Sequence, residues 1–150
     1  MPDYKHIILE KDPNEHIARL TINRPERRNA LNDDATAEMG QAIDDVAADD
    51  DIRVLILTGA GQAFCAGGDL NALKGGSDPG MWVSENTDDI RRSFGLAQRM
   101  ILGLQRMEKP VIAMINGTAV GAGFDIACAC DIRIASAKAR FMVAYVRIGL

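Results

Sequence analysis

The sequence has few of the residues on which metal sites and disulfide frameworks depend. Its 150 residues include three cysteines, Cys65, Cys128 and Cys130, and two histidines, His6 and His16. Three cysteines cannot all pair with one another, and in the absence of a secretory signal we expect free, buried thiols. The spacing Cys128-x-Cys130 is not that of a zinc site, and neither histidine lies near it in the sequence. The sequence therefore predicts no bound metal.

Long apolar runs and an excess of positive charge are also missing. No run approaches the ~20 apolar residues that a membrane-spanning helix needs. The first six residues, Met1 to His6, lack the basic and apolar regions of a signal peptide, so we expect a cytoplasmic protein that does not enter membranes. The net charge of -4 and the pI of about 5.1 argue against nucleic acid as a partner, because general nucleic-acid binders are usually basic.

Several familiar nucleotide and nucleophile motifs are incomplete or missing. The segment Gly59-Ala60-Gly61 follows an apolar run, but the sixth position of the dinucleotide-binding pattern is Phe64 rather than glycine. The sequence has no G-x-x-x-x-G-K-[ST] phosphate loop and no G-x-S-x-G nucleophile elbow. Neither histidine lies near a serine or cysteine motif with which it would form a catalytic triad. A nucleotide-binding α/β domain therefore stays only as an alternative hypothesis.

The pattern of apolar residues predicts strands that alternate with helices in a single domain. Strands are expected at residues 6–10, 16–22, 54–59, 111–115, 131–135 and 140–142, the first two forming a hairpin. Helices are expected from Asn32 to about Asp49 and from Thr87 or Asp88 to about Glu108. The second helix carries an apolar stripe of residues spaced four and three apart, Ile90, Phe94, Ala97, Ile101 and Leu104. A helix between two strands indicates an α/β protein with parallel strands.

The stretch from Asn116 to Asp125 has the strongest signature of a functional site. We interpret it as a glycine-rich turn between the strand 111–115 and a buried helix that is apolar on all sides over 126–130. Small residues let a ligand approach the backbone, and the first N–H groups of a helix carry a partial positive charge. A developing negative oxygen would be stabilised there. Asp125, an ionisable residue in an apolar segment, is predicted to be paired or functional.

A second glycine-rich segment, Ala66-Gly67-Gly68, offers the same kind of backbone donor as Gly121-Ala122-Gly123. Each segment by itself is better explained as a tight turn. Together, two N–H groups that converge on one point form an oxyanion hole, which stabilises an oxygen as it becomes negative. Because the donors belong to the backbone, such a site requires small residues rather than particular side chains.

These blocks, in this order, resemble the crotonase (enoyl-CoA hydratase/isomerase) superfamily. The resemblance runs from Thr21 to Leu150 and rests on Asn23-Arg24-Pro25 with Asn29-Ala30-Leu31-Asn32, on 64–70, on 116–123 and on 130–135. It implies an α/β fold in which repeated ββα units stack into a spiral. It also implies an enzyme of the hydratase/isomerase type that acts on an acyl-CoA thioester, with coenzyme A as part of the substrate and no other cofactor.

The resemblance also assigns roles to individual residues. The oxyanion donors are the backbone N–H groups of Ala66 and Ala122. Residues expected to bind the acyl-CoA lie in the first loop and the two glycine-rich segments, and they are Arg27, Arg28, Ala30, Ala66, Gly67, Gly68, Asp69, Leu70 and Gly121. Arg27 and Arg28 form a basic cluster with Arg24, for which two interpretations stay open. The cluster contacts the phosphates of coenzyme A, because arginine forks match phosphate oxygens, or it is a solvated loop.

The acid–base residues that the resemblance implies are Asp125 and Tyr145. Typical hydratases of the family use two glutamates that handle one water molecule, and these positions hold Asp125 and Tyr145 here. A tyrosine, with a pKa near 10, is a poor base at neutral pH but donates a hydrogen bond or a proton. Some acyl-CoA decarboxylases of the superfamily carry a tyrosine there, so decarboxylation is the alternative reaction. A core aromatic with a satisfied hydroxyl group is the alternative role of Tyr145.

A further alternative is a non-catalytic relative that binds acyl-CoA or RNA on the same scaffold, although the acidic pI argues against RNA. By resemblance, residues 1–150 are expected to be the N-terminal core of the spiral, without the C-terminal helices that build trimers in the family. The full-length protein is accordingly expected to be a homotrimer or a dimer of trimers.

Overall fold

The computed structural model describes residues 3–69 and 86–147, and it begins with the predicted hairpin. Strand β1, Ile7–Asp12, pairs antiparallel with β2, Ile17–Ile22, and Leu9 lies opposite Leu20. The carboxylate of Asp12 accepts the backbone N–H of Asn14 at 2.9 Å, which closes the turn between the strands. The alternating apolar residues of the two strands point into the core.

Two sheets are built from the eight strands of the described chain. The larger sheet has the order β1-β2-β3-β5-β7, with β3 at Val54–Gly59, β5 at Val111–Ile115 and β7 at Ile132–Ala135. The smaller sheet has the order β4-β6-β8, at Ala63–Cys65, Thr118–Val120 and Arg140–Met142. Every pair except β1 with β2 is parallel, as the continuous apolar run of β3 indicates.

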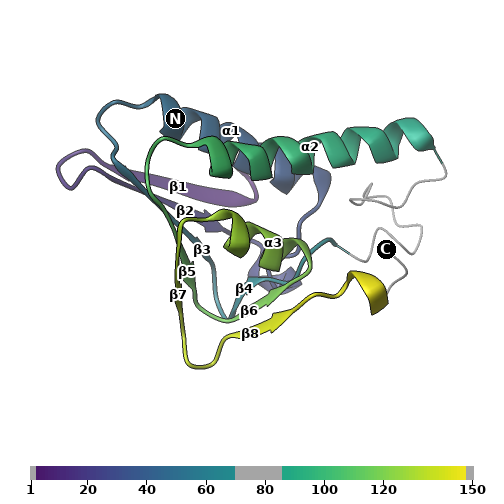
Figure 1. The fold of residues 1–150 in the computed structure, drawn as a ribbon. Coiled ribbons are helices and arrows are strands. Elements are labelled where there is room, and N and C mark those ends of the chain that lie inside the picture. The colour runs from purple at the N-terminus through teal and green to yellow at the C-terminus, as the bar shows by residue number, and fades with distance from the viewer. Residues whose placement is uncertain (1–2, 70–85, 148–150) are drawn as a thin grey trace.

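Each turn of the chain adds one strand to each sheet. Strand β3 is followed by β4, β5 by β6 and β7 by β8. Helix α2, Thr87–Arg106, follows the first of these pairs, and helix α3, Ala122–Ala129, follows the second. Figure 1 shows the result, in which α3 lies between α2 and the short strands β4 and β6. The predicted spiral of ββα units is therefore confirmed.

The short strands β4 and β6 were not predicted from the sequence. Each has three residues, too few to show an apolar periodicity, and β6 interrupts the expected passage from β5 directly into a glycine-rich turn and a helix. What makes them strands is their pairing with each other, Ala63 opposite Thr118 and Cys65 opposite Ala119. This pairing joins segments far apart in the sequence, so no local pattern predicts it.

Two long helices lie side by side over the larger sheet (Figure 1). Helix α1, Asp33–Ala48, begins where the Asn32 side chain accepts the N–H of Ala35 at 3.0 Å. Helix α2, Thr87–Arg106, begins in the same way with Asn86. No helix within the described ranges is both long and apolar enough to cross a membrane.

Helix α3, Ala122–Ala129, is buried on one face only, whereas the sequence predicted a helix buried on all sides. It buries one face, which includes Ile126 and Ala127, against the short strands, while Asp125 and Cys128 are exposed on the other. Eight residues make about two turns, and only one side of them meets the sheet. For the same reason one of the three thiols expected to be buried, that of Cys128, is exposed, whereas those of Cys65 and Cys130 are buried.

The close approach of α3 to β4 depends on Gly123. A Cβ atom added there would lie 2.7 Å from the Cβ of Cys65 and would overlap the Cys65 carbonyl oxygen. We expect Gly123→Ala to lower the free energy of unfolding by about 1–3 kcal/mol, measured by chemical denaturation. The control is Gly95→Ala in α2, where an added Cβ meets nothing within 4 Å and alanine should raise stability by ~1 kcal/mol. Equal effects of the two substitutions would contradict this packing.

Candidate active site

The two glycine-rich segments predicted to act together lie side by side. The parallel pairing of β4 with β6 brings the chain after Cys65 next to the chain after Val120. Gly67 has a φ of 93°, and a Cβ atom there would lie 2.8 Å from the Val120 carbonyl oxygen and 3.7 Å from the Ala122 nitrogen. Only a glycine adopts this conformation and tolerates this contact without strain. The juxtaposition required for a shared oxyanion site is therefore present.

The Ala122 amide has the properties expected of an oxyanion donor. Ala122 is the first residue of α3, so its N–H has no partner within the helix and lies at the positive end of the helix dipole. No described residue accepts a hydrogen bond from this N–H. Gly121, by contrast, uses its backbone within the protein, because its N–H donates to the Met142 carbonyl at 2.9 Å and its carbonyl accepts the Asp125 N–H.

The Ala66 amide does not have these properties, contrary to the assignment made by resemblance. Its N–H donates to the Arg28 carbonyl oxygen at 3.0 Å and is therefore already used. The Gly68 amide is a better candidate. The Gly67 carbonyl accepts the Leu31 N–H at 2.8 Å, and in a trans peptide the N–H of the next residue, Gly68, points the opposite way. No acceptor for the Gly68 N–H is recorded within the described chain.

Asp125 and Tyr145 form a hydrogen-bonded pair. The Tyr145 hydroxyl donates to Asp125 Oδ2, although the two residues lie 20 positions apart. Asp125 lies one turn into α3 and is exposed, whereas Tyr145 lies in the short 3-10 helix Tyr145–Arg147 and is half-buried. The structure thus joins the two residues singled out for acid–base chemistry. The sequence analysis placed Asp125 in a buried helix, whereas the structure shows that this residue is exposed.

The electrostatics of this pair keep the phenol protonated. Burial, together with the hydrogen bond to Asp125 and the negative charge of its carboxylate, raises the pKa of Tyr145 well above its ordinary value near 10. Tyr145 is accordingly a donor and not a base at neutral pH. Burial also raises the pKa of the nearby Cys65 thiol to about 12, so this cysteine stays protonated and is not a nucleophile.

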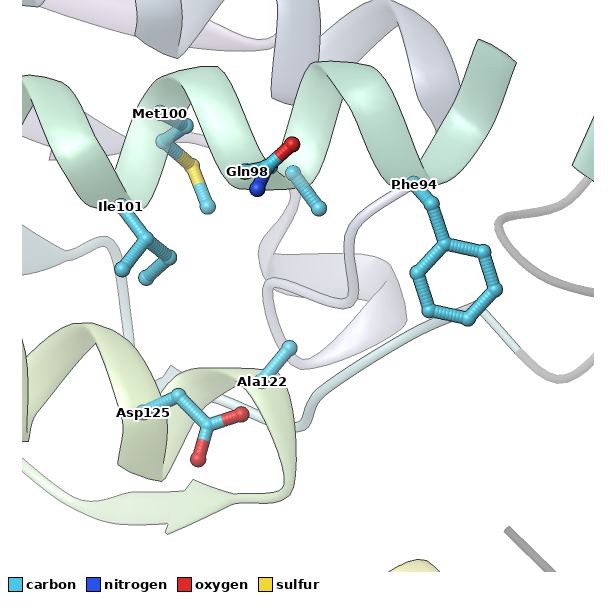
Figure 2. Close-up of a pocket in the computed structure, with 7 residues that line it drawn as sticks. Phe94, Gln98, Met100, Ile101, Ala122 and Asp125 are labelled. Carbon is cyan, nitrogen blue, oxygen red and sulfur yellow. The ribbon is translucent and has the colours of Figure 1, made fainter. Parts of the chain in front are cut away.

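An apolar pocket opens beside Ala122 and Asp125. Its volume is about 410 Å³, and the described residues that line it are Phe94, Ala97, Gln98, Met100, Ile101, Ala122 and Asp125. Figure 2 shows α2 on one side and α3 on the other, with Phe94 and Ile101 at opposite ends. Phe94, which belongs to the apolar stripe on α2, is 44% exposed and lines this pocket instead of the core.

A comparison of the sequence with known protein families also finds a match. The model of the family described as enoyl-CoA hydratase/isomerase matches residues 12–150, most of the chain. The chain belongs to the enoyl-CoA hydratase/isomerase family. Two similar proteins are the short-chain-enoyl-CoA hydratase of Clostridium acetobutylicum and the 1,2-epoxyphenylacetyl-CoA isomerase of Escherichia coli. The first is 40% identical over 149 residues, which cover 99% of this chain and 53% of the relative. The second is 40% identical over 134 residues, which cover 89% and 49%.

Solved structures of the family have the same fold. An enoyl-CoA hydratase/isomerase from Xanthobacter autotrophicus superposes with a TM-score of 0.85 at 30% identity, covering 98% of this chain and 52% of that one. An enoyl-CoA hydratase from Bacillus anthracis superposes with a TM-score of 0.83 at 28% identity, covering 97% and 53%. The chain spans about half the length of the curated relatives that it matches.

The first-loop residues assigned to the substrate by resemblance include both exposed and buried ones. Arg27 and Arg28 are exposed and remain candidates for a phosphate contact. Arg24, the third member of the basic cluster, is buried and bound to Asp69, so neither of these two side chains is free to contact a ligand. Ala30 is buried as well. Leu70, also assigned to the substrate, lies outside the described residues.

The sequence analysis gave no structural role to Asn29 and Asn116, the two asparagines that hold the loop before β4. The Asn29 side chain donates to the carbonyl oxygens of Ala60 and Ala63, at 2.8 and 2.7 Å. The Asn116 side chain donates to the Gly59 carbonyl at 2.8 Å and to the Gly61 carbonyl at 2.9 Å. Asn29 is buried and Asn116 is half-buried, and each satisfies backbone carbonyls that must be paired when they leave water. Nothing in the local sequence indicates these partners.

Proposed function

We propose that the full-length protein is an acyl-CoA enzyme of the hydratase/isomerase type that stabilises a thioester enolate. The observation that carries this proposal is the arrangement on α3. The amide of Ala122, for which the described residues supply no acceptor, and the carboxylate of Asp125 lie one helical turn apart, and both residues line the same apolar pocket. A helix N-terminus stabilises a negative oxygen, and a carboxylate at a pocket accepts a proton.

The chemistry follows from these two groups. The thioester carbonyl oxygen would accept hydrogen bonds from the amides of Ala122 and Gly68. Asp125 would take a proton from the carbon next to the carbonyl, and the electron pair left behind would move onto the carbonyl oxygen, giving the enolate. The proton would then return to the same carbon or to one further along the acyl chain. Backbone donors that are already oriented need no reorganisation as the charge develops.

Exchange of the α-proton with solvent tests this proposal directly. Butyryl-CoA offered to the full-length protein in D2O should gain deuterium next to the carbonyl, which mass spectrometry detects. This saturated substrate requires neither addition of water nor loss of CO2, so exchange isolates the enolate step. Parallel incubations with crotonyl-CoA, a 3-enoyl-CoA and methylmalonyl-CoA would then separate hydration, isomerisation and decarboxylation. Binding without turnover of any of these substrates would favour the non-catalytic alternative.

Decarboxylation is the second candidate, and the state of Tyr145 favours it specifically. Loss of CO2 from a malonyl-type thioester leaves an enolate that needs a proton and no base. The raised pKa of Tyr145 keeps a proton on the phenol beside Asp125. Hydration by two carboxylates is not supported by the described part of the site, because Asp125 is the one carboxylate among the residues that line the pocket there.

Tyr145→Phe is expected to slow turnover by ~10–100-fold without weakening acyl-CoA binding, because it removes a proton donor and the hydrogen bond to Asp125 but little volume. Steady-state kinetics and calorimetric titration measure the two effects. Because the pKa of Tyr145 is raised, its deprotonation should cause no loss of wild-type activity up to about pH 10. An unchanged rate in Tyr145→Phe would return this residue to a packing role.

We further propose that the protein uses no cofactor other than the coenzyme A of its substrate and acts in the cytoplasm as a homotrimer or a dimer of trimers. These expectations rest on the resemblance to the family whose model matches residues 12–150. Mass measurement of the full-length protein in solution, with and without acyl-CoA, would test the assembly and the absence of a bound cofactor.

A further inference from the structure

A buried ion pair includes Asp69, the residue that follows the glycine-rich segment Ala66-Gly67-Gly68. The side chains of Arg24 and Asp69 are 7% and 8% exposed, and Arg24 Nη2 lies 3.1 Å from Asp69 Oδ2. The other terminal nitrogen of the guanidinium group, Nη1, donates to the Ala30 carbonyl oxygen. One arginine therefore connects the first loop with the segment that contains Gly68.

The contribution of such a pair to the stability of the fold does not by itself explain its presence. Moving two charges out of water is costly, and replacing a buried ion pair by apolar residues of similar volume is often neutral or stabilising. What an arginine supplies instead is geometry, since its planar fork holds two acceptors in fixed directions. Here the two acceptors are the Ala30 carbonyl and the Asp69 carboxylate.

The segments that Arg24 connects are paired along their backbones. The Ala66 N–H donates to the Arg28 carbonyl at 3.0 Å, the Leu31 N–H to the Gly67 carbonyl at 2.8 Å, and the Asp69 N–H to the Leu31 carbonyl at 2.9 Å. All three bonds face the first loop, so the Gly68 N–H faces away from it. The two glycines have the greatest backbone freedom, and the direction of this N–H therefore depends on the anchors on either side.

We propose that Arg24 is a positioning residue for the Gly68 amide and that it acts through its buried ion pair with Asp69. The pair fixes the residue that follows Gly68, and the Ala30 contact fixes the loop that holds the Gly67 carbonyl. Together they hold the Gly68 N–H in one direction. This inference rests on the proposed function, because it concerns an oxyanion donor.

The test compares two ligands that differ only at the carbonyl group. Butyryl-CoA is a thioester, and S-butyl-CoA is the corresponding thioether without the oxygen, so the ratio of their affinities for the full-length protein reports contacts to that oxygen alone. The double variant Arg24→Met with Asp69→Leu replaces the ion pair by apolar residues. We expect it to fold, to bind the thioether as the wild type does, to lose most of the preference for the thioester, and to exchange the α-proton about 100-fold more slowly.

A matched control is Lys11→Met, which breaks the ion pair of Lys11 with Asp49, at 2.8 Å, outside the candidate site. It should lower stability but leave the affinity ratio unchanged. Asp69→Asn keeps an acceptor oxygen and should give a preference between those of the wild type and the double variant. If the double variant does not fold, Asp69→Asn decides the question.

The outcomes separate this proposal from the proposed function. A wild-type preference for the thioester that survives in the double variant, or in Asp69→Asn where only that variant folds, would overturn the role of Arg24 and leave the oxyanion hole intact. An equal loss of preference in Lys11→Met would overturn it too, because general destabilisation would then explain the effect. A wild-type protein that binds both ligands equally well would overturn the oxyanion hole itself.

Discussion

Asp125→Asn is expected to slow α-proton exchange by ~10²–10⁴-fold, while butyryl-CoA still binds. The substitution keeps the size of the side chain and removes the carboxylate that would take the proton. Asp125 lies at the pocket wall and is exposed, so the loss of its charge should not disturb the core. Deuterium incorporation measures the rate, and calorimetric titration measures the binding.

The matched control for Asp125→Asn is Asp34→Asn, which removes an exposed carboxylate from the first turn of α1, away from the pocket. It should leave exchange unchanged. A second readout comes from Tyr145, because the Asp125 carboxylate contributes to its raised pKa. In Asp125→Asn the phenol should titrate at a lower pH than in the wild type, as followed by phenolate absorbance. If Asp125→Asn exchanges the α-proton normally, Asp125 is not the base.

Ala122→Pro should lower kcat/KM by ~10²–10³-fold, the effect of removing one donor from an oxyanion hole. Proline has no backbone N–H, and at the first position of a helix it is well tolerated. Ala122 is the first residue of α3, and Gly121 before it has a ψ of -120°, outside the helical range that a following proline disfavours. The substitution therefore removes the proposed donor while preserving the helix.

Thr87→Pro provides the control for the proline itself. Thr87 is the first residue of α2, and Asn86 before it is extended, with a φ of -96° and a ψ of 115°, which suits a following proline. This variant should keep full activity and stability, as measured by the same kinetics and by thermal unfolding. Normal activity in Ala122→Pro would mean that the thioester oxygen does not bind at this amide.

The strands and helices that rest on long apolar patterns could be predicted from the sequence. The hairpin, β3 and α1 were predicted within one or two residues, because alternation, a continuous apolar run and an asparagine cap are local signals. The family resemblance also rests on the order of short motifs, which is a property of the sequence alone. The three-residue strands β4 and β6 had no such signal.

The candidate site was predicted in part. Asp125, Tyr145 and the two glycine-rich segments were identified, and the structure brings them together, although their roles stay predictions. Only the tertiary structure decided which backbone N–H groups have an acceptor within the described residues. The Ala66 N–H donates to the Arg28 carbonyl, whereas no described residue accepts the Gly68 N–H. The tertiary structure likewise decided that Arg24 is bound to Asp69 and that Asp125 is exposed. The sequence by itself determined which residue types are available to the site and their order. Which of their atoms remain unpaired depends on hydrogen bonds between segments far apart in the chain, and those bonds exist only once the chain has folded.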